Sequence, residues 1–517
     1  MSTVATNPFI SLHVDDNIAV AARHVPAGTT AEIAGRGVTT GDAIDLGHKV
    51  AVSDINKGQP VKKFGQTIGF ASRDIPAGTW VHTHNVLIGA LELDYACASE
   101  IPPDPEPITG RTFMGYRRPD GRAATRNYVG IISTVNCSAS TSKYAAARFD
   151  HALLEQYENI DGVIPLVHKA GCAMQYGGED HFQLNRVLSG FAKHPNIGAY
   201  VIVGLGCETG PGSFLAEKTG LVQLQIPGQE PDKLPLILNI QDVGGVRKTV
   251  ERTVEVLKEL LPEANKFRRE PIPVSELILG CECGGSDGNS GVTANPALGV
   301  ASDLLIAHGG TSILAETPEI CGGEHTLTRR AATKEIGERL IERVRWWEDY
   351  TAKFGVEINN NPSPGNKKGG LTTIYEKSLG AIAKGGRTAL KAVYQYAEPV
   401  TEKGFVFMDS PGYDPASVTG MVAGGANVVV FTTGRGSCFG CKPVPSIKVA
   451  TNTPMYERMV DDMDINAGRI LDGATVEEVG TEIFEMIVAT ASGEKTKSEL
   501  QGIGDEEFCP WSIGPVL

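Results

Sequence analysis

The chain has 517 residues, with 47 basic and 61 acidic side chains and a formal net charge of −14. That length predicts several domains, and the acidic balance argues against a nucleic-acid partner. No apolar run approaches the roughly 18 to 20 residues of a membrane span, so we expect no membrane contact. The N-terminus has no basic segment followed by an apolar one, and the ten cysteines form no dense framework, which together predict a reducing cytoplasm.

The first hundred residues predict a small all-β domain. Short β-type runs such as HKVAVSDI and TIGFASRDI are separated by turn sequences, and PAGT occurs at 26–29 and again at 76–79. A proline-rich acidic stretch, IPPDPEPITG, follows at 101–110 and has the composition of an extended linker.

Histidines are concentrated in this β region. His82 and His84 alternate with a threonine, so we expect them on one face of a strand, where they would suit a metal or acid–base site. The alternative is a solvent-exposed edge strand. His48 belongs to a GHK motif directly before an apolar strand.

After the linker, apolar β-branched runs alternate with helix-length polar segments, which predicts an α/β fold with largely parallel sheets. A charged, proline-containing break near 262–275 separates two such regions. We therefore expect a β domain over 1–100, a linker over 101–110, and α/β domains over 111–268 and 269–517. The expected elements include strands near 129–135, 162–167, 200–205 and 276–280, and helices near 138–158, 180–193, 246–262 and 475–492.

Four of the apolar runs end in a cysteine: Cys137, Cys172, Cys207 and Cys283. Because the carboxyl ends of parallel strands line the ligand crevice, we expect these thiols to converge. Four sulfur ligands suggest an iron or zinc site, and three would hold an iron–sulfur cluster with one open iron. The alternative is that each cysteine is a small buried side chain at a strand end.

Polar residues also gather at strand ends. HKAGCAMQYGGEDH combines His168, a thiol and carboxylates within 14 residues. Further candidates lie in the glycine-rich segments CGGSDGNSGVTANP, NPSPGNKKGG and GRGSCFGC, whose lysines and arginine suit a carboxylate ligand. The candidate binding residues there are Ser286, Asp287, Asn295, Asn366, Lys367, Lys368 and Arg435.

Together with GHKVAVSDINKG, FGQTIGFASRDIPAGTWVHTHN, GLGCE and IKVATN, these motifs resemble the altronate dehydratase and galactarate dehydratase family of sugar-acid dehydratases. The resemblance covers essentially the whole chain. It implies an N-terminal SAF-type β-clip domain and removal of water from a hexonate or hexarate, with divalent iron as the usual metal. VHTHN and HKAGC look closer to the altronate type, so conversion of D-altronate to 2-dehydro-3-deoxy-D-gluconate is expected.

The chain departs from the family pattern in GRGSCFGC and in Cys281 beside Cys283. Galactarate dehydration and cleavage of sulfite from sulfolactate, the activity of a related branch, therefore remain alternatives. A sugar acid and further copies of the same chain are the expected partners.

The implied chemistry is a β-elimination, which needs a base at C2, an acid at the C3 hydroxyl and a metal or cationic clamp on the carboxylate. We expect His168 or His48 to transfer one proton and Lys367 or Lys368 to orient the carboxylate. The cofactor is expected to be Fe²⁺ or another divalent metal, with an iron–sulfur cluster as the alternative. A single iron would suit histidine and carboxylate ligands, for example among His82, His84, His168 and Glu316.

Overall fold

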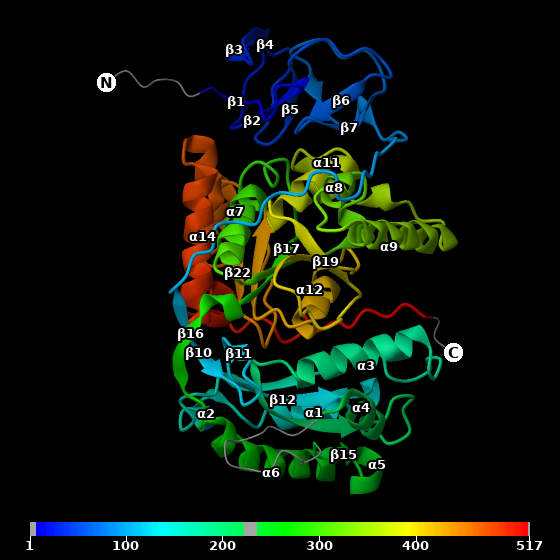
Figure 1. The fold of residues 1–517 in the computed structure, drawn as a ribbon, viewed down its shortest axis with the longest axis vertical. Coiled ribbons are helices and arrows are strands. Elements are labelled where there is room, and N and C mark those ends of the chain that lie inside the picture. Colours follow the sequence, from blue (N-terminus) through cyan, green and yellow to red (C-terminus); the bar gives the residue numbers. More distant parts are fainter. Residues whose placement is uncertain (1–6, 222–234, 515–517) are drawn as a thin grey trace.

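The computed structural model of the chain describes residues 7–221 and 235–514. Figure 1 shows an N-terminal β domain at the top, a C-terminal α/β domain in the centre, and a second α/β domain at the bottom. The last domain in sequence therefore lies between the other two. Among the described residues, no helix is long and apolar enough to cross a bilayer.

The N-terminal β domain contains only antiparallel strand pairs among its described residues. They form a four-stranded sheet in the order β1-β2-β5-β8, a three-stranded sheet in the order β6-β7-β9, and the hairpin β3-β4. Buried aliphatic side chains such as Ile18, Val20, Val61 and Ile68 fill the space between them. The strands are β1 (Phe9–Ile10), β2 (Ile18–Ala21), β3 (Thr30–Ile33), β4 (Arg36–Thr39), β5 (Lys49–Ala51), β6 (Pro60–Lys63), β7 (Gln66–Ala71), β8 (Trp80–Val81) and β9 (Val86–Leu87).

The second domain has a four-stranded parallel sheet in the order β13-β12-β14-β15. Successive side chains of a strand point to opposite faces, so Val129 and Ile131 pack on α1 and α6, whereas Tyr128 and Ile132 pack on α3. Both faces are covered, as expected for apolar parallel strands. The elements are β12 (Tyr128–Ser133), β13 (Gly162–Leu166), β14 (Ile197–Gly204), β15 (Ile237–Asn239), α1 (Asn136–Ala146), α2 (His151–Leu154), α3 (Glu179–Ala192), α4 (Gly212–Thr219), α5 (Ile240–Val243) and α6 (Val246–Ala264).

The C-terminal domain is built on a seven-stranded parallel sheet in the order β19-β20-β18-β17-β21-β22-β23. Helices α7 and α14 cover one face, on which α9 packs nearer β19 and β20, while α12 covers the other face. Its strands are β17 (Ile278–Cys283), β18 (Thr311–Leu314), β19 (Leu390–Tyr394), β20 (Gly404–Met408), β21 (Val428–Thr433), β22 (Ser446–Ala450) and β23 (Ile465–Asn466). Its α-helices are α7 (Ala294–Ala307), α8 (His325–Arg329), α9 (Lys334–Lys353), α10 (Pro364–Lys368), α11 (Ile374–Ile382), α12 (Asp414–Ala423), α13 (Thr453–Arg458), α14 (Val476–Ala491) and α15 (Lys497–Leu500).

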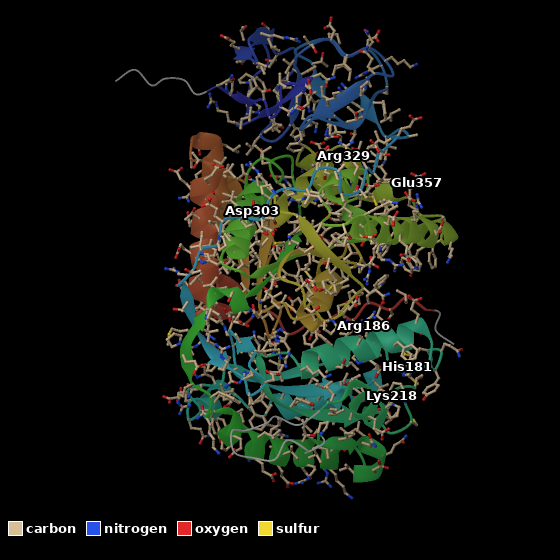
Figure 2. All side chains as sticks on the ribbon, in the orientation of Figure 1. His181, Arg186, Lys218, Asp303, Arg329 and Glu357 are labelled. Atoms are coloured by element: carbon tan, nitrogen blue, oxygen red, sulfur yellow. The ribbon has the colours of Figure 1, made fainter. Side chains whose placement is uncertain are left out.

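The two α/β domains share a core in which α3 packs on α12. The helices approach closely at Gly190, where an added Cβ would lie 2.4 Å from the carbonyl oxygen of Ala423. Arg186, labelled on α3 in Figure 2, extends across the boundary and donates to Gln395 Oε1 at 3.2 Å. The second and C-terminal domains are therefore packed together and are not merely tethered.

A small antiparallel sheet, in the order β11-β10-β16, lies where the chain passes between these domains. Its strands are β10 (Thr112–Arg117), β11 (Ala123–Ala124) and β16 (Arg269–Pro273). Strand β10 leads into the second domain, and β16 leads out of it beside β10. The domain limits expected at residues 110 and 268 stay predictions. Both positions lie next to strands of this small sheet, because β10 begins at 112 and β16 begins at 269.

The predicted fold class is confirmed: a small antiparallel SAF domain is followed by α/β units with parallel sheets. The prediction that His82 and His84 alternate along a strand was wrong. Both lie in the turn between β8 and β9, where the Asn85 side chain accepts a hydrogen bond from the His82 amide at 2.8 Å. A turn that closes on an asparagine side chain competes with the extended conformation.

Candidate active site

The β domain contacts the C-terminal domain through the GHK motif. His48 Nε2 lies 3.2 Å from the carbonyl oxygen of Lys368, and Lys49 Nζ donates to that of Gly370 at 2.5 Å. The approach is close, because a Cβ on Gly288 would lie 1.9 Å from the carbonyl oxygen of Gly47. Two of the motifs singled out from the sequence, GHK and NPSPGNKKGG, therefore meet in the structure.

A buried ion cluster fixes this contact. Glu376, at the start of α11, accepts hydrogen bonds from Lys49 at 2.8 and 3.0 Å and from Lys63 at 2.9 Å. All three side chains are at most 1% exposed. Burial acts to raise the pKa of Glu376, but the two lysine charges outweigh it and hold that pKa well below its usual value. Burial lowers the pKa of Lys49 to about 8.

Three histidines surround Trp80 at the same interface. The Trp80 indole donates to His48 Nδ1 at 3.1 Å, and its ring stacks on His82 with centroids 5.2 Å apart. The His84 ring lies 4.9 Å from Trp80. Burial, reinforced by the charge of Lys49, lowers the pKa of His82 to about 3, so this ring is neutral near pH 7. Its Nδ1 is buried and has no hydrogen-bond partner.

The loops after β17, β21 and β22 form the opposite wall, because these three strands are neighbours in a parallel sheet. Asp287 accepts hydrogen bonds from Thr451 at 3.0 Å and from Asn452 at 3.0 Å, which ties the first loop to the third. The backbone amide of Arg435 donates to the carbonyl oxygen of Gly285 at 2.8 Å and ties in the second. The carboxylate of Asp287 therefore holds the loops in place.

The remaining predicted binding residues divide into two groups. Asn295 bonds to Thr432 and Gly380, and Asn366 donates to the Ser286 carbonyl oxygen at 2.8 Å, so these two amides also hold loops together. By contrast, the Ser286 hydroxyl and both side-chain polar atoms of Asn289 are buried without a partner. Unpaired buried polar groups are costly, so they favour a ligand at this position.

Cations lie around this wall at different depths. Lys368 and Arg435 are exposed, and Lys367 is half-buried. The Cβ that Gly369 lacks would lie 3.2 Å from Arg435 Cδ and 2.9 Å from Asp287 Cβ, so Arg435 runs beside this loop. The loop that carries Lys367 and Lys368 therefore lies beside Arg435, at the edge of the buried polar groups.

A second cluster, which we call the acid cluster, consists of Cys283, Glu282, Glu316, Glu319 and Asp414. It lies at the carboxyl ends of β17 and β18 and at the start of α12, and Glu316 is 1% exposed. Two groups of potential ligand atoms each lie within 4.8 Å of one another, and both include Glu316. The first is Cys283, Glu316 and Glu319, and the second is Glu282, Glu316 and Asp414.

Two buried lysines partly balance this negative charge. Lys384 Nζ lies 2.9 Å from Cys283 Sγ and 3.6 Å from Glu316 Oε2. Lys377 pairs closely with Glu319. Because Lys377 also bonds Asn361 Oδ1 at 3.0 Å, it connects the acid cluster to the NPSPGNKKGG loop.

Burial and mutual repulsion perturb the acids of this cluster. Burial raises the pKa of Glu282 to about 7 and that of Asp414 to about 6. The pKa of Glu316 is raised well above its usual value by burial and by the charges of Glu282 and Glu319. Glu319 differs, because Lys377 outweighs burial and lowers its pKa. A cluster in which several acids hold protons while one stays ionised can transfer protons or bind a cation.

The donor set fits a divalent cation. Among the described residues, no nitrogen or hydroxyl group donates to either oxygen of Glu316 or to Glu282 Oε2, and all three atoms are buried. Carboxylate oxygens with one thiolate are ligands that iron or another first-row metal accepts. The residues present therefore provide a candidate metal site, in which Glu316 was predicted as an alternative ligand.

The other predicted site residues lie in the second domain. His168 is 7% exposed, and both ring nitrogens contact backbone groups: Nε2 with Ser133 O at 2.9 Å and Nδ1 with the Ala170 amide at 3.2 Å. Burial lowers the pKa of His168 to about 4. It therefore connects the β12 and β13 loops, and its assignment as the alternative to His48 for proton transfer stays a prediction.

The expected convergence of four cysteines is also revised. Cys137, Cys172 and Cys207 follow strands of the second domain and are exposed, whereas Cys283 ends β17 of the C-terminal domain and is buried. The domain limit expected at 268 lies between Cys207 and Cys283, so the sequence already held a signal against the convergence of all four.

Several residues of the site were missed from the sequence, namely Lys63, Glu282, Glu319, Glu376, Lys377, Lys384 and Asp414. Some signal for them existed. Glu282 interrupts the otherwise apolar run LILGCEC, and Lys384 follows the apolar helix sequence LGAIA. A charged residue within an apolar pattern is a candidate for a buried, paired group.

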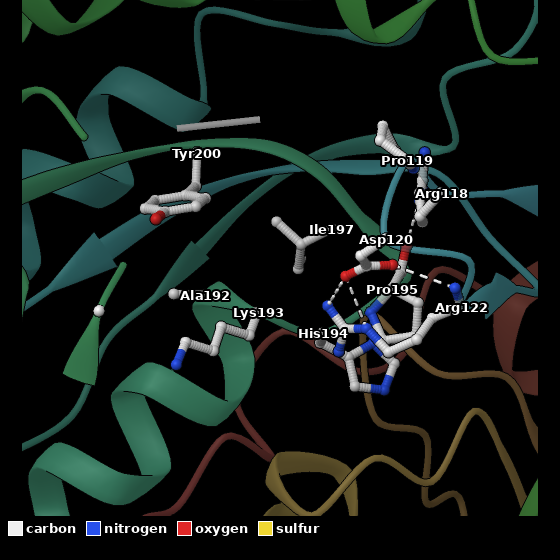
Figure 3. Close-up of a pocket in the computed structure, with 11 residues that line it drawn as sticks. Arg118, Pro119, Asp120, Arg122, Ala192, Lys193, His194, Pro195, Ile197 and Tyr200 are labelled. Carbon is white, nitrogen blue, oxygen red and sulfur yellow. Dashed lines mark hydrogen bonds and ion pairs between the residues drawn. The ribbon is translucent and has the colours of Figure 1, made fainter. Parts of the chain in front are cut away.

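A cavity of about 220 Å³ in the second domain contains none of these groups. Figure 3 shows it lined by Arg118, Asp120, Arg122 and His194, with Asp120 and Arg122 paired to each other. It is therefore separate from the candidate site.

Together, the fold and the site define an α/β enzyme whose β domain covers a polar, cation-rimmed set of strand-end loops beside buried acids. Comparison with known proteins adds the family. Sequence models match residues 7–88 as the altronate/galactarate dehydratase SAF domain and 115–265 as the D-galactarate dehydratase/altronate hydrolase second domain. A third matches 274–516 as the D-galactarate/altronate dehydratase C-terminal domain.

Characterised relatives agree along nearly the full chain. Altronate dehydratase of Bacillus subtilis (strain 168) is 36% identical over 95% of this chain and 96% of its own length. Galactarate dehydratase (L-threo-forming) of Escherichia coli (strain K12) is 38% identical over 96% of this chain and 95% of its own length. The β subunit of (2R)-sulfolactate sulfo-lyase of Chromohalobacter salexigens is 32% identical over 78% of this chain and 97% of its own length. The chain belongs to the altronate/galactarate dehydratase family and is a hydro-lyase.

Proposed function

We propose that this enzyme removes water from a hexonate, with D-altronate as the substrate and 2-dehydro-3-deoxy-D-gluconate as the product. The observation that carries the proposal is the meeting of His48 and His82 with the cationic loop 361–370 and Arg435. This arrangement offers a neutral imidazole and fixed positive charges on the two sides of one interface. Unpartnered Ser286 and Asn289 supply hydrogen-bonding groups for substrate hydroxyls.

In the proposed reaction, a base takes the proton from C2, and the electron pair of that bond moves into the carboxylate to give an enediolate. When this pair returns to form the C2–C3 double bond, the C3–oxygen bond breaks, the hydroxyl leaves as water with a proton from the enzyme, and the enol tautomerises to the 2-keto acid. Lys367, Lys368 and Arg435 hold the carboxylate, where negative charge develops in the enediolate. A histidine of the β domain transfers one of the protons.

The acid cluster would hold the metal through Cys283, Glu316 and Glu319, or through Glu282, Glu316 and Asp414. We propose ferrous iron, which would supply Lewis-acid stabilisation of the charge on substrate oxygen. The lysines at its edge have a separate role: Lys377 keeps Glu319 ionised, and Lys384 lies beside the Cys283 sulfur.

The experiment is a substrate panel with ferrous iron under anaerobic conditions, using D-altronate, galactarate and sulfolactate. Formation of a 2-keto-3-deoxy acid from altronate supports the proposal. If galactarate alone is dehydrated, the proposed substrate is wrong but the proposed dehydration reaction stands. Sulfite release from sulfolactate without dehydration of either sugar acid would overturn the proposal.

Galactarate remains the second candidate because a galactarate dehydratase is among the relatives that match almost the whole chain. The sulfo-lyase alternative has less support. That relative is a β subunit matching 78% of this chain, whereas this chain also carries the β domain whose histidines we place in the site.

A further inference from the structure

Three exposed cysteines lie at one edge of the second domain and have no role in the proposed dehydration site. Cys137, Cys172 and Cys207 follow β12, β13 and β14, which are neighbours in the order β13-β12-β14. These strands are parallel, so the loops after them emerge at the same edge of the sheet. None of the three thiols forms a disulfide.

Backbone hydrogen bonds bring the three loops into contact. The amide of Asn136 donates to the carbonyl oxygen of Ala170 at 3.0 Å, and the amide of Thr209 donates to that of Gly171 at 3.1 Å. Each of these four residues lies within two positions of one of the cysteines. The thiols therefore come from a single group of touching loops.

The loop conformations are tightly determined. Gly171 has φ +98°, and a Cβ there would lie 2.3 Å from the carbonyl oxygen of Thr134. Ala173, directly after Cys172, has φ +57°, which is strained for a residue other than glycine. The buried Glu208 carboxylate accepts hydrogen bonds from Thr134 Oγ1 and the Gly206 amide, both at 2.6 Å. Strain of this kind persists where the surrounding structure holds a functional geometry.

The surroundings of the thiols suit a thiolate-ligated group. Gln241 Nε2 donates to Cys207 Sγ at 3.3 Å, and hydrogen bonds to sulfur are a recognised way of tuning iron–sulfur centres. Cys172 lines a cavity of about 560 Å³ that is also lined by Lys143, Lys169, Asp180 and Glu506, with Lys143 paired to Glu506 at 2.7 Å. There is consequently room for a bound group beside Cys172.

We infer that Cys137, Cys172 and Cys207 hold an iron–sulfur cluster with one iron not bound by the protein. A single zinc ion would require all three sulfurs within about 4.6 Å of one another, twice a Zn–S bond of roughly 2.3 Å. Among the described residues, the groups whose ligand atoms all lie within 4.8 Å of one another do not include these three thiols, which disfavours a single ion. A cluster of several irons spaces its ligands further apart. Each thiol would release its proton to solvent and bind one iron as a thiolate, without a change of oxidation state.

This site goes beyond the proposed dehydratase function and can be tested without it. The full-length protein is reconstituted anaerobically with ferric iron, inorganic sulfide and excess dithiothreitol, which reduces part of the iron to the ferrous state that the cluster requires. It is then desalted and analysed for iron, acid-labile sulfide and visible absorption. The parent should retain both elements and a visible absorption band. C137S, C172S and C207S should each lose the sulfide and the band, whereas C438S, an exposed cysteine outside these loops, should retain them.

Alkylation gives a second readout that does not depend on variants. In the reconstituted parent, peptide mass spectrometry should find Cys137, Cys172 and Cys207 protected from iodoacetamide and Cys438 modified. The inference would be overturned if the parent bound no sulfide. It would also be overturned if C137S, C172S and C207S retained as much sulfide as C438S. E316Q separates the two sites, because it should lose turnover while keeping the sulfide content of the parent.

Discussion

At the scale of single residues, Glu316 is the acid of the cluster whose ionised form is opposed both by burial and by two neighbouring carboxylates. It is fully buried near Glu282 and Glu319, and Lys384 Nζ, 3.6 Å from Oε2, lies too far away to donate a hydrogen bond. Without a bound cation this carboxyl is favourable only when protonated, because burial and like charges oppose its ionised form. The same features make it a good ligand, since a metal would compensate all of these costs together.

We therefore expect E316Q to stabilise the metal-free protein by about 1 to 2 kcal/mol and to abolish metal binding at this cluster. E319Q is the matched comparison and should destabilise it, because Lys377 would lose its ionic partner. Urea unfolding in the presence of a chelator measures both effects. Destabilisation by E316Q equal to that by E319Q would contradict the account of the unpaired acid.

Arg435 and Lys367 provide the test of carboxylate binding. Changing either to Met should lower kcat/KM by about one to two decades, the loss expected for one charge-assisted contact. Lys334, an exposed lysine on α9, is the control, and K334M should leave the kinetics unchanged. Normal kcat/KM in both R435M and K367M, with folding intact, would remove these loops from the site.

At the scale of elements, α11 contributes to the domain interface through one side chain, Glu376. E376Q leaves Lys49 and Lys63 buried without their anion, so we expect a loss of about 3 to 5 kcal/mol in unfolding free energy. E342Q on α9, where the side chain is 68% exposed, should change stability by less than about 0.5 kcal/mol. Denaturant unfolding at neutral pH compares the two variants.

The same residue predicts a pH dependence. Its pKa lies below the ordinary value of 4.5, so the unfolded chain takes up a proton before the folded one on acidification. The stabilisation is therefore complete above 4.5 and is lost as the pH falls below it. Unfolding measured from neutral to acid pH should show a steeper loss for the parent than for E376Q. Parallel pH profiles would contradict the ion cluster.

The elements differ in how far the sequence predicts them. Buried parallel strands are continuous apolar runs, so β12, β13, β14 and β17 were recognisable, as were the polar motifs at their ends. The Lys49–Glu376–Lys63 cluster was not, because it depends on the docking of two domains. Glu376 has the same local context as an ordinary helical glutamate. The separation of Cys283 from the other three cysteines was partly predictable, since the break expected near 262–275 lies between Cys207 and Cys283.

At the scale of the whole molecule, the β domain should need its contact with the C-terminal domain for activity. Gly288→Val would place side-chain atoms against the Gly47 carbonyl, 1.9 Å from the ideal Cβ position, and should separate the domains. We expect turnover to be lost and proteolysis of the 101–110 linker to accelerate. Gly37→Val is the control, since no atom lies within 4 Å of its Cβ position. Full activity in Gly288→Val would show that the β domain is not part of the site.

The pairing of β10 with β16 has a consequence for how such a chain can change. The chain enters residues 118–268 from β10 and leaves them through β16, and these two strands are adjacent and antiparallel, with Tyr116 opposite Arg269. The second domain is thus an insertion whose two attachment points are neighbours. A different domain could replace it without lengthening the connection, provided that it also covers the α12 surface on which α3 packs. Recombination could therefore exchange the cysteine-bearing unit while leaving the sugar-acid site covalently continuous with its β domain.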